Sequence, residues 1–230
     1  MKTIGLLGGM SWESSLEYYR MLNQGIRERL GGLHSARCLM YSFDFFEIEQ
    51  LQMQNNWDAA ASLLVKGSQN LEAGGADCLI ICTNTMHKLA SQIEAAISIP
   101  LIHIADPTAE AIQSAGLNKV GLLGTRFTME QNFYKGRLQD QWGLQVLIPA
   151  ADERETIHTI IYDELVVGQV KDTSRQRYQE IIHNLSDQGA EAIILGCTEI
   201  GLLIKASDSP LPVFDTTYLH AMAALEWALA

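Results

Sequence analysis

Two places in the chain end an apolar run in small polar and thiol side chains. The first is Ile80–His87 (IICTNTMH) and the second is Ile194–Glu199 (ILGCTE). Hydroxyl, amide and thiol groups at the ends of buried strands can handle protons on a small molecule held between them. The two places differ in one respect, because the second offers the thiol of Cys197 where the first offers the hydroxyl of Thr83.

The spacing of these places indicates an internal duplication. Gly5–Gly9 (GLLGG) recurs as Gly121–Thr125 (GLLGT) at an offset of 116 residues, and Thr83 recurs as Cys197 at an offset of 114. A proline followed by two apolar residues recurs at an offset of 112. Three matches in order at nearly constant spacing predict two similar halves.

Apolar runs of strand length alternate with helical patterns along the whole chain. This alternation predicts parallel sheets with right-handed crossovers, and the continuous apolar runs are typical of strands covered on both faces. We therefore expect an α/β fold of two similar Rossmann-like domains, the first formed by residues 1–98 with 216–230 and the second by residues 99–215. The expected strands are Thr3–Leu7, Arg37–Phe43, Asp77–Cys82, Leu101–Ile104, Val120–Leu123, Leu144–Ile148, Ala190–Leu195 and Val213–Asp215. The expected helices are Ser14–Leu30, Trp57–Ala73, Met86–Ala96, Thr108–Ser114, Met129–Trp142, Glu155–Val167, Ser174–Gln188 and Tyr218–Leu229.

Composition narrows the class of protein. The 230 residues are 47% hydrophobic, which excludes disorder, and the net charge of −11 argues against nucleic acid as a partner. The sequence shows no signal peptide and no membrane-length apolar run, so we expect a cytoplasmic protein. Cys38, Cys78, Cys82 and Cys197 lack the spacing of a disulfide framework or a metal site, so we expect reduced thiols and no metal.

Four predicted strand ends carry polar or small residues, at Gly8–Trp12, Thr83–Thr85, Gly124–Arg126 and Cys197–Glu199. Taken singly, each is explained by a tight turn or a helix cap. Ligands of parallel sheets bind beyond the carboxyl ends of the strands, so the four together predict a binding site. The glycines do not follow the GxGxxG pattern, which argues against a dinucleotide.

Cys197 is the strongest candidate for chemistry at this site. A thiol acts as a base only when it is a thiolate, and its pKa falls near a helix N-terminus. Glu199 opposes that effect unless it is protonated or serves another group. A cysteine–histidine hydrolase stays open, with His87, His103 and His220 as partners, although each of these is more often structural.

These motifs resemble the aspartate/glutamate racemase superfamily, in its bacterial amino-acid racemase branch. The resemblance spans essentially the whole chain and rests on Ile4–Met10, on Asn84-Thr85-x-His87 and on Gly196–Glu199. It implies two domains related by a pseudo-twofold axis with the active site in the cleft between them. It also implies proton transfer at the α-carbon of a small amino acid without cofactor, PLP or metal, and a homodimer.

The resemblance also implies roles for individual residues. Cys197 is expected to remove the α-proton of L substrates, and Thr83 stands at the position of the family's other cysteine. Cys82 is one residue earlier, and a regular strand would point it to the opposite side. The expected substrate-binding residues are Met10, Ser11, Trp12, Asn84, Thr85, Thr125, Thr198 and Glu199.

Two departures from the family pattern shape the functional hypothesis. A threonine hydroxyl is a far weaker base than a thiolate, so we expect slow turnover that is biased toward L substrates. Members that act on aspartate bind its distal carboxylate with an Arg and a Lys, and these positions fall near Glu49 and Val166 here, so Arg126, Lys171 or backbone amides would have to compensate. The alternatives are a one-thiol decarboxylase or cis-trans isomerase of the same superfamily, or a catalytically weak amino-acid-binding module.

Overall fold

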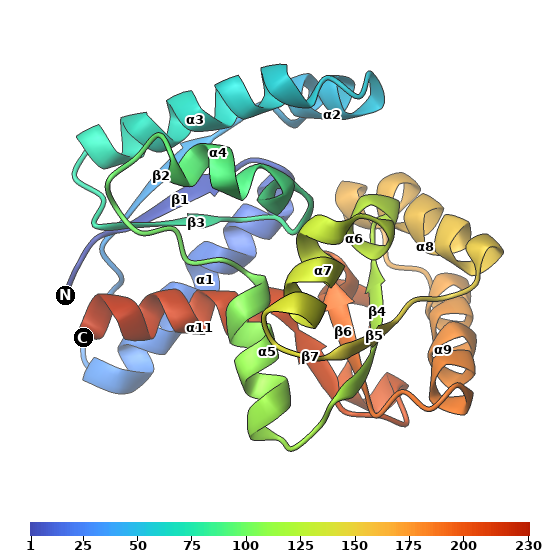
Figure 1. Cartoon of the computed structure of the whole chain (residues 1–230). Helices are drawn as coiled ribbons and strands as arrows, with labels where there is room; N and C mark the ends of the chain where they lie inside the picture. The colour runs from blue at the N-terminus through green and yellow to red at the C-terminus, as the bar shows by residue number, and fades with distance from the viewer. The chain divides into compact units, whose positions relative to one another are not determined.

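The computed structural model describes residues 1–230. The chain forms two compact units, one of Met1–Ile104 with His220–Ala230 and one of Ala105–Leu219. Each unit contains one parallel sheet with helices on both faces (Figure 1). The predicted α/β class with two parallel sheets is confirmed, whereas the domain limits and the pseudo-twofold axis stay predictions.

The sheet of the first unit has the strand order β2-β1-β3, with β1 at Ile4–Gly8, β2 at Cys38–Ser42 and β3 at Cys78–Ile81. All its strands are parallel. The predicted strand at 101–104 was too long. It is reduced to a single bridge between Leu101 and Leu79, because the chain turns into a helix at residue 105.

Alternate residues of β3 point into two separate cores, as strand geometry requires. Leu79 and Ile81 pack toward helix α3 (Trp57–Ala73). Cys78, Ile80 and Cys82 pack on the other face with helices α1 (Trp12–Leu30) and α11 (Thr216–Leu229). Figure 1 shows the resulting three layers, with α3 on one side of the sheet and α1 and α11 on the other.

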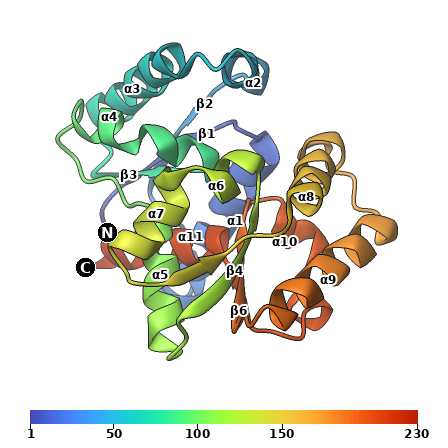
Figure 2. The same ribbon diagram turned by 45° about the vertical axis from the view of Figure 1, so that its right-hand side comes forward.

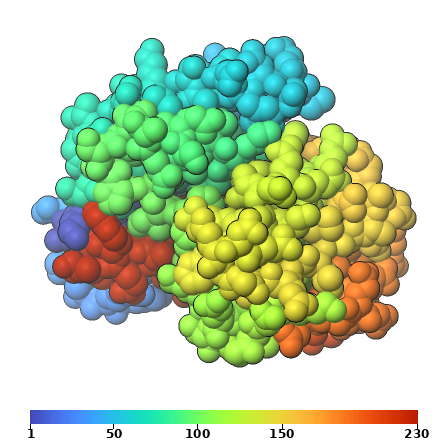
Figure 3. Space-filling model, in the orientation of Figure 1, coloured from blue at the N-terminus to red at the C-terminus, as the bar shows by residue number.

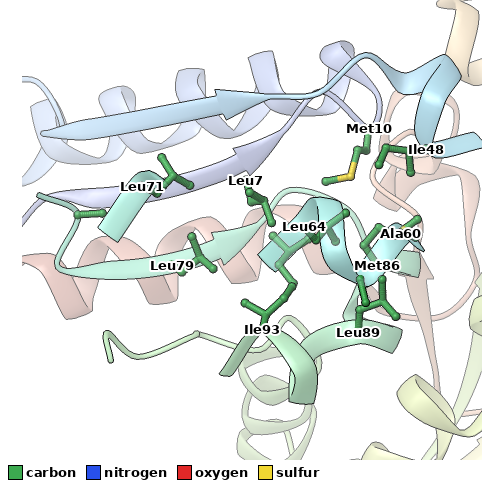
Figure 4. Packing of buried hydrophobic residues seen from close by; sticks show 13 residues of the cluster. Leu7, Met10, Ile48, Ala60, Leu64, Leu71, Leu79, Met86, Leu89 and Ile93 are labelled. Carbon is green, nitrogen blue, oxygen red and sulfur yellow. The ribbon is translucent and has the colours of Figure 1, made fainter. Parts of the chain in front are cut away.

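The core on the α3 face extends to the carboxyl end of the sheet. Figure 4 shows Leu7 beside Leu64 of α3 and Met10 beside Ile48, and Leu79 belongs to the same cluster. In the space-filling view, α3, α4 (Ala90–Glu94) and α11 form most of the visible surface of this unit (Figure 3).

One helix of the first unit was not predicted. Helix α2 spans Phe45–Met53 and begins at Asp44, whose carboxylate accepts a hydrogen bond from Phe46 N at 3.1 Å. Its apolar residues do not form one buried face, since Phe46 and Met53 are exposed while Ile48 is buried, and this explains why the helix was not predicted from the sequence. The remaining element of this unit is the 3-10 helix η1 at Thr85–Leu89.

The second unit repeats the arrangement with four parallel strands in the order β5-β4-β6-β7. Figure 2 shows α8 and α9 on one face of this sheet and α5 and α7 on the other. The elements are β4 (Lys119–Gly124), β5 (Gln145–Leu147), β6 (Ala192–Gly196), β7 (Val213–Asp215), α5 (Ala105–Ser114), α6 (Arg126–Glu130), α7 (Asn132–Asp140), α8 (Ala151–Asp163), η2 (Leu165–Val167), α9 (Asp172–Asp187), α10 (Ile200–Leu203) and η3 (Ala206–Asp208).

None of the helices combines the length and apolar character required to cross a membrane.

The turn after β1 depends on a glycine. Gly9 has φ +87°, a conformation that L side chains rarely adopt. A Cβ at this position would lie 2.7 Å from Ser42 Oγ and closer still to the Phe43 backbone. The turn therefore requires Gly9 for its conformation and also for the close approach of the neighbouring loop.

We predict that Gly9→Ala destabilises the protein by about 3 kcal/mol, the sum of backbone strain and overpacking. Gly31→Ala is the matched control, because Gly31 also has positive φ (+73°) but a Cβ added there would have nothing within 4 Å. It should cost only about 1–2 kcal/mol. Urea denaturation measures both free energies of unfolding, and equal losses would contradict the role of the close approach.

Candidate active site

Strand pairing fixes where Thr83 lies in the first unit. Leu7 of β1 is the register partner of Ile81 at the end of β3. Cys82 N donates a hydrogen bond to Leu7 O at 2.9 Å, and Thr83 follows as the first residue beyond that bond. Thr83 therefore stands at the carboxyl edge of the sheet, next to the turn that follows β1.

The second unit places Cys197 in the same way. Leu123 of β4 is the register partner of Leu195 of β6, and Cys197 lies two residues beyond Leu195. Thr83 lies two residues beyond Ile81, which has the matching register. The two sheets thus make Thr83 and Cys197 structural counterparts, although each is in its own unit and their facing across a cleft stays a prediction.

Cys82 and Thr83 have different surroundings. Cys82 is fully buried in the core formed with α1 and α11, and burial raises the pKa of its thiol far above the usual value. Thr83 is half-buried. The thiol of Cys82 therefore belongs to the packed core, and Thr83 is the residue of the pair that reaches the strand end.

The side chains of the loop after β1 mainly form hydrogen bonds and packing contacts within the first unit. Ser11 caps α1 by accepting a hydrogen bond from Ser14 N at 3.4 Å, and Gly9 N donates to Ser15 Oγ at 2.7 Å. Met10 is buried in the core beside α2, so its backbone is the part suited to contact a substrate. These contacts are all within the protein, so substrate binding by Met10 and Ser11 stays a prediction.

Trp12 lies apart from these buried side chains. It is 64% exposed and lines a hollow of about 450 Å³ with residues of α1 and β2. The other residues that line it are Ser15, Leu16, Tyr19, Cys38, Met40 and Ser42.

The polar residues after Thr83 are all buried. Asn84, Thr85 and His87 have exposed fractions of 2%, 5% and 2%. The Asn84 side chain does not cap the short helix η1 that begins beside it. A buried amide and a buried hydroxyl at this edge of the sheet are suited to donate hydrogen bonds to a carboxylate.

The loop after β4 runs beside Cys197 because two glycines pack together. Gly124 and Gly196 are register partners, and a Cβ on Gly124 would lie 2.7 Å from Gly196 O. Thr125 then caps α6 by accepting a hydrogen bond from Thr128 N at 3.3 Å. The structure thus brings Thr125 to the same sheet edge as the thiol.

Cys197, Thr198 and Glu199 form a compact hydrogen-bonded group. The Cys197 thiol donates to Glu199 Oε2 at 2.9 Å, and the Thr198 hydroxyl donates to the same oxygen at 2.8 Å. All three residues are less than 9% exposed. The carboxylate is therefore in direct contact with the sulfur proton.

Burial, together with the charge and hydrogen bond of Glu199, raises the pKa of the Cys197 thiol well above its usual value. Backbone N–H groups of Thr198 and Glu199 act in the opposite direction, because they stabilise the thiolate. In this arrangement the resting form is a thiol whose proton is held by a carboxylate.

Sequence reasoning did not identify Tyr178, which lies on α9 near this group. Burial raises the pKa of its phenol well above the usual value, and the charges of Cys197 and Glu199 add to the effect. Tyr178 therefore stays protonated beside the thiol. No signal in the linear sequence connects it to Cys197, since only the packing of α9 on the sheet brings it there.

The cations that could bind an acidic substrate side chain already have partners. Arg126 pairs with Glu155 at 3.2 Å, and Lys171 pairs with Glu164 at 3.1 Å. Glu49, near which the sequence resemblance placed one of the two expected cations, accepts a hydrogen bond from the neighbouring Gln50 at 3.1 Å.

Comparison with known proteins identifies the family of the chain. A family model described as Asp/Glu/Hydantoin racemase matches residues 7–224. The broad specificity amino-acid racemase RacX of Bacillus subtilis is 23% identical over 180 residues, which cover 75% of this chain and 74% of RacX.

Two crystal structures match the chain over the full length of both proteins. One, from Yersinia pestis and provisionally assigned as an Asp/Glu racemase, has 53% identity and a TM-score of 0.93. The other, an aspartate racemase homologue from Pyrococcus horikoshii, has 33% identity and a TM-score of 0.87.

The chain belongs to the Asp/Glu/Hydantoin racemase family. Its relatives are amino-acid racemases, which are isomerases that need no PLP, and the resemblance seen in the sequence is confirmed.

We predict that Glu199→Gln makes Cys197 reactive at lower pH. The carboxylate raises the thiol pKa by its charge and its hydrogen bond, so a neutral amide should lower that pKa. Since only the thiolate reacts, the midpoint of iodoacetamide labelling against pH should move down. Mass spectrometry of the Cys197 peptide gives the midpoint.

The exposed carboxylate of Glu180, which pairs with Arg177 on α9, provides a control in Glu180→Gln, whose midpoint should equal that of the unmodified protein. A midpoint in Glu199→Gln that is unchanged or higher would show that Glu199 does not govern the thiol.

Proposed function

We propose that the protein is a cofactor-independent amino-acid racemase or epimerase that transfers the α-proton of a small L-amino acid, with Cys197 as the thiolate base and Thr83 as an unequal partner. The main support is the matching register of the two sheets, which makes Thr83 the counterpart of Cys197. The direct contact between the Cys197 thiol and Glu199 supplies a route for the sulfur proton.

The base forms by proton movement within the Cys197–Glu199 pair. When the thiol proton passes to Glu199, the pair keeps a single negative charge, so no additional charge is buried. The positive α-ammonium group of the substrate favours the thiolate beside it. The resulting thiolate then removes the α-proton of the L enantiomer, and the thiol re-forms.

The electron pair left on the α-carbon must be stabilised by donors around the substrate carboxylate. We assign this role to the buried amide of Asn84, the hydroxyls of Thr85 and Thr198, and nearby backbone N–H groups. The Thr83 hydroxyl, or a water that it holds, returns a proton to the opposite face. Solvent then restores the lost proton on the Thr83 side and accepts the extra one from Cys197.

The difference between Cys197 and Thr83 should affect α-proton exchange with solvent more than net racemisation. The enantiomers are equal in free energy, so kcat/KM for racemisation must be the same in both directions. Cys197 can return a solvent proton to the face from which it took the first, whereas Thr83 protonates the other face slowly. L substrates should therefore exchange their α-proton faster than they invert, and faster than D substrates exchange.

We predict that Cys197→Ala lowers α-proton exchange of L substrates by about 10²–10⁴-fold, the usual contribution of a positioned base. Proton NMR in deuterated water measures the exchange over a panel of acidic and neutral polar amino acids. Cys38→Ala is the control, because Cys38 is a partly buried thiol in the other unit. This variant should exchange the substrate α-proton at the rate of the unmodified protein.

Exchange that persists in a folded Cys197→Ala protein would contradict the assignment of the base. Equal exchange of L and D enantiomers in the unmodified protein would contradict the asymmetry.

We predict that Thr83→Cys raises α-proton exchange of D substrates, because it places a second thiol opposite the first. Thr83→Val keeps the shape of threonine but removes the hydroxyl, so it should lower the yield of inverted product. Chiral chromatography separates the enantiomers formed by each variant. A folded Thr83→Cys protein with no gain in D exchange would count against Thr83 as the partner.

A second candidate is a one-thiol decarboxylase or cis-trans isomerase of the same superfamily. The observation that favours it is the position of Cys82, which is sequestered in the core and leaves Cys197 as the thiol at a strand end. Loss of carbon dioxide or geometric isomerisation of an unsaturated diacid, in place of α-proton exchange, would identify these activities. An amino-acid-binding module would bind the panel equally well with Cys197→Ala and show no exchange at all.

A further inference from the structure

The proposed chemistry leaves a buried cluster of three histidines in the first unit without a role. His87, His103 and His220 have exposed fractions of 2%, 4% and 0%. The ring centroids of His87 and His103 are 4.6 Å apart, and those of His87 and His220 are 5.5 Å apart. His87 is therefore the central ring of the cluster, and it lies only four residues beyond Thr83.

Both ring nitrogens of His87 contact backbone groups. Nδ1 lies 2.8 Å from the Thr83 carbonyl oxygen, and Nε2 lies 3.2 Å from Ile104 N. A carbonyl oxygen only accepts a hydrogen bond and a backbone N–H only donates one. His87 must therefore carry its proton on Nδ1 and accept at Nε2, so the ring is neutral and its tautomer is fixed.

The neighbouring ring of His220 packs against His87 and has a defined tautomer of its own. His220 Nε2 lies 2.7 Å from Ile102 O and must donate to it, so His220 Nδ1 accepts from the Tyr18 hydroxyl at 2.8 Å. His220 packs against His87 at an interplanar angle of 65°. Burial and the two neighbouring histidines also keep the pKa of His87 well below its usual value, in agreement with a neutral ring.

Thr83 lies where the regular backbone pairing has ended. It follows the last residue of β3, Ile81, and precedes η1, so no strand partner defines its backbone. The hydrogen bond from His87 Nδ1 fixes the direction of the Thr83 carbonyl. Because the carbonyl and the side chain are attached to the same Cα, fixing one restricts where the other can point.

We propose that His87 is a positioning residue that orients Thr83 toward the substrate and so controls how often the α-carbon is protonated on the Thr83 face. The inference rests on the proposed racemase function and adds a residue to it. His87 does not touch the substrate in this scheme and carries no charge, so it acts only through the Thr83 backbone.

The test is the ratio of inverted to retained product formed from one L substrate in deuterated water. Both products arise from the same carbanion, so the ratio reports how it divides between Thr83 and Cys197. A variant that merely loses folded protein lowers both products equally and leaves the ratio unchanged. Proton NMR gives total exchange and chiral chromatography gives the inverted fraction.

His87→Leu removes both hydrogen bonds, and we expect the ratio to fall about tenfold or more, since small displacements of a reacting group have large effects on rate. His87→Gln retains one donor and one acceptor and should recover most of the loss. Tyr18→Phe is the matched control, because it breaks a hydrogen bond in the same cluster but leaves both hydrogen bonds of His87 in place, and its ratio should stay normal. An unchanged ratio in folded His87→Leu would overturn the proposal.

If His87→Leu does not fold, nitrogen-15 NMR of the imidazole in the unmodified protein decides the matter. We expect the neutral tautomer protonated at Nδ1, and a ring protonated at Nε2 would overturn the proposal. If the unmodified protein shows no exchange that depends on Cys197, the proposed function fails and this inference fails with it. If exchange that depends on Cys197 is present but the ratio of inverted to retained product is the same in folded His87→Leu, only this inference fails.

Discussion

Parallel pairing between the two central strands of each sheet is the constraint on which the rest of the structure depends. The pairing of β1 with β3 and of β4 with β6 has the same register, because Leu7 pairs with Ile81 as Leu123 pairs with Leu195. Thr83 and Cys197 each lie two residues beyond these partners, at the carboxyl edge of their own sheet. A shift of one residue in the pairing of β1 with β3 would turn every side chain of β3 to the opposite face. Cys82 would then leave the core and Thr83 would be buried in it.

The same register defines how the two halves differ chemically. At the constant offset of 114 residues, Thr83, Asn84 and Thr85 correspond to Cys197, Thr198 and Glu199. The second half therefore has an ionisable thiol in contact with a carboxylate. The first half has hydroxyls and an amide, and its carbonyl is held by a neutral imidazole. In the proposed site the Cys197 side can form an anionic base, whereas the Thr83 side can only donate or relay a proton.

Much of the fold could be predicted from the sequence because its elements have strong apolar patterns. Helix α3 and strand β7 were predicted with the limits that the structure shows, since each pattern is bounded by a cap or a proline. Helix α2 was missed because its apolar residues do not form one buried face. The choice between Cys82 and Thr83 could not be fixed by the sequence, because it depends on which face of β3 meets α1 and α11.

The hydrogen bonds of the site were beyond sequence analysis for a related reason. Glu199 was identified as a neighbour of Cys197, but only the folded loop shows that the carboxylate accepts the thiol proton. His87 was interpreted as a residue that is more often structural, and its hydrogen bond to Thr83 O was not foreseen. This bond forms because the helix η1 directs the His87 ring toward the end of β3. Side-chain direction at irregular segments is set by tertiary packing rather than by residue pattern.

The proposed mechanism requires that one substrate be held between Thr83 and Cys197. A crystal structure of the Cys197→Ala variant with an L-amino acid bound tests this most directly. We predict that the α-carbon lies between the Thr83 hydroxyl and the Cβ of residue 197, with the hydroxyl about 3.5 Å away on the face opposite the α-proton. An amino acid bound against only one of these residues, or a packed core between them, would contradict the account.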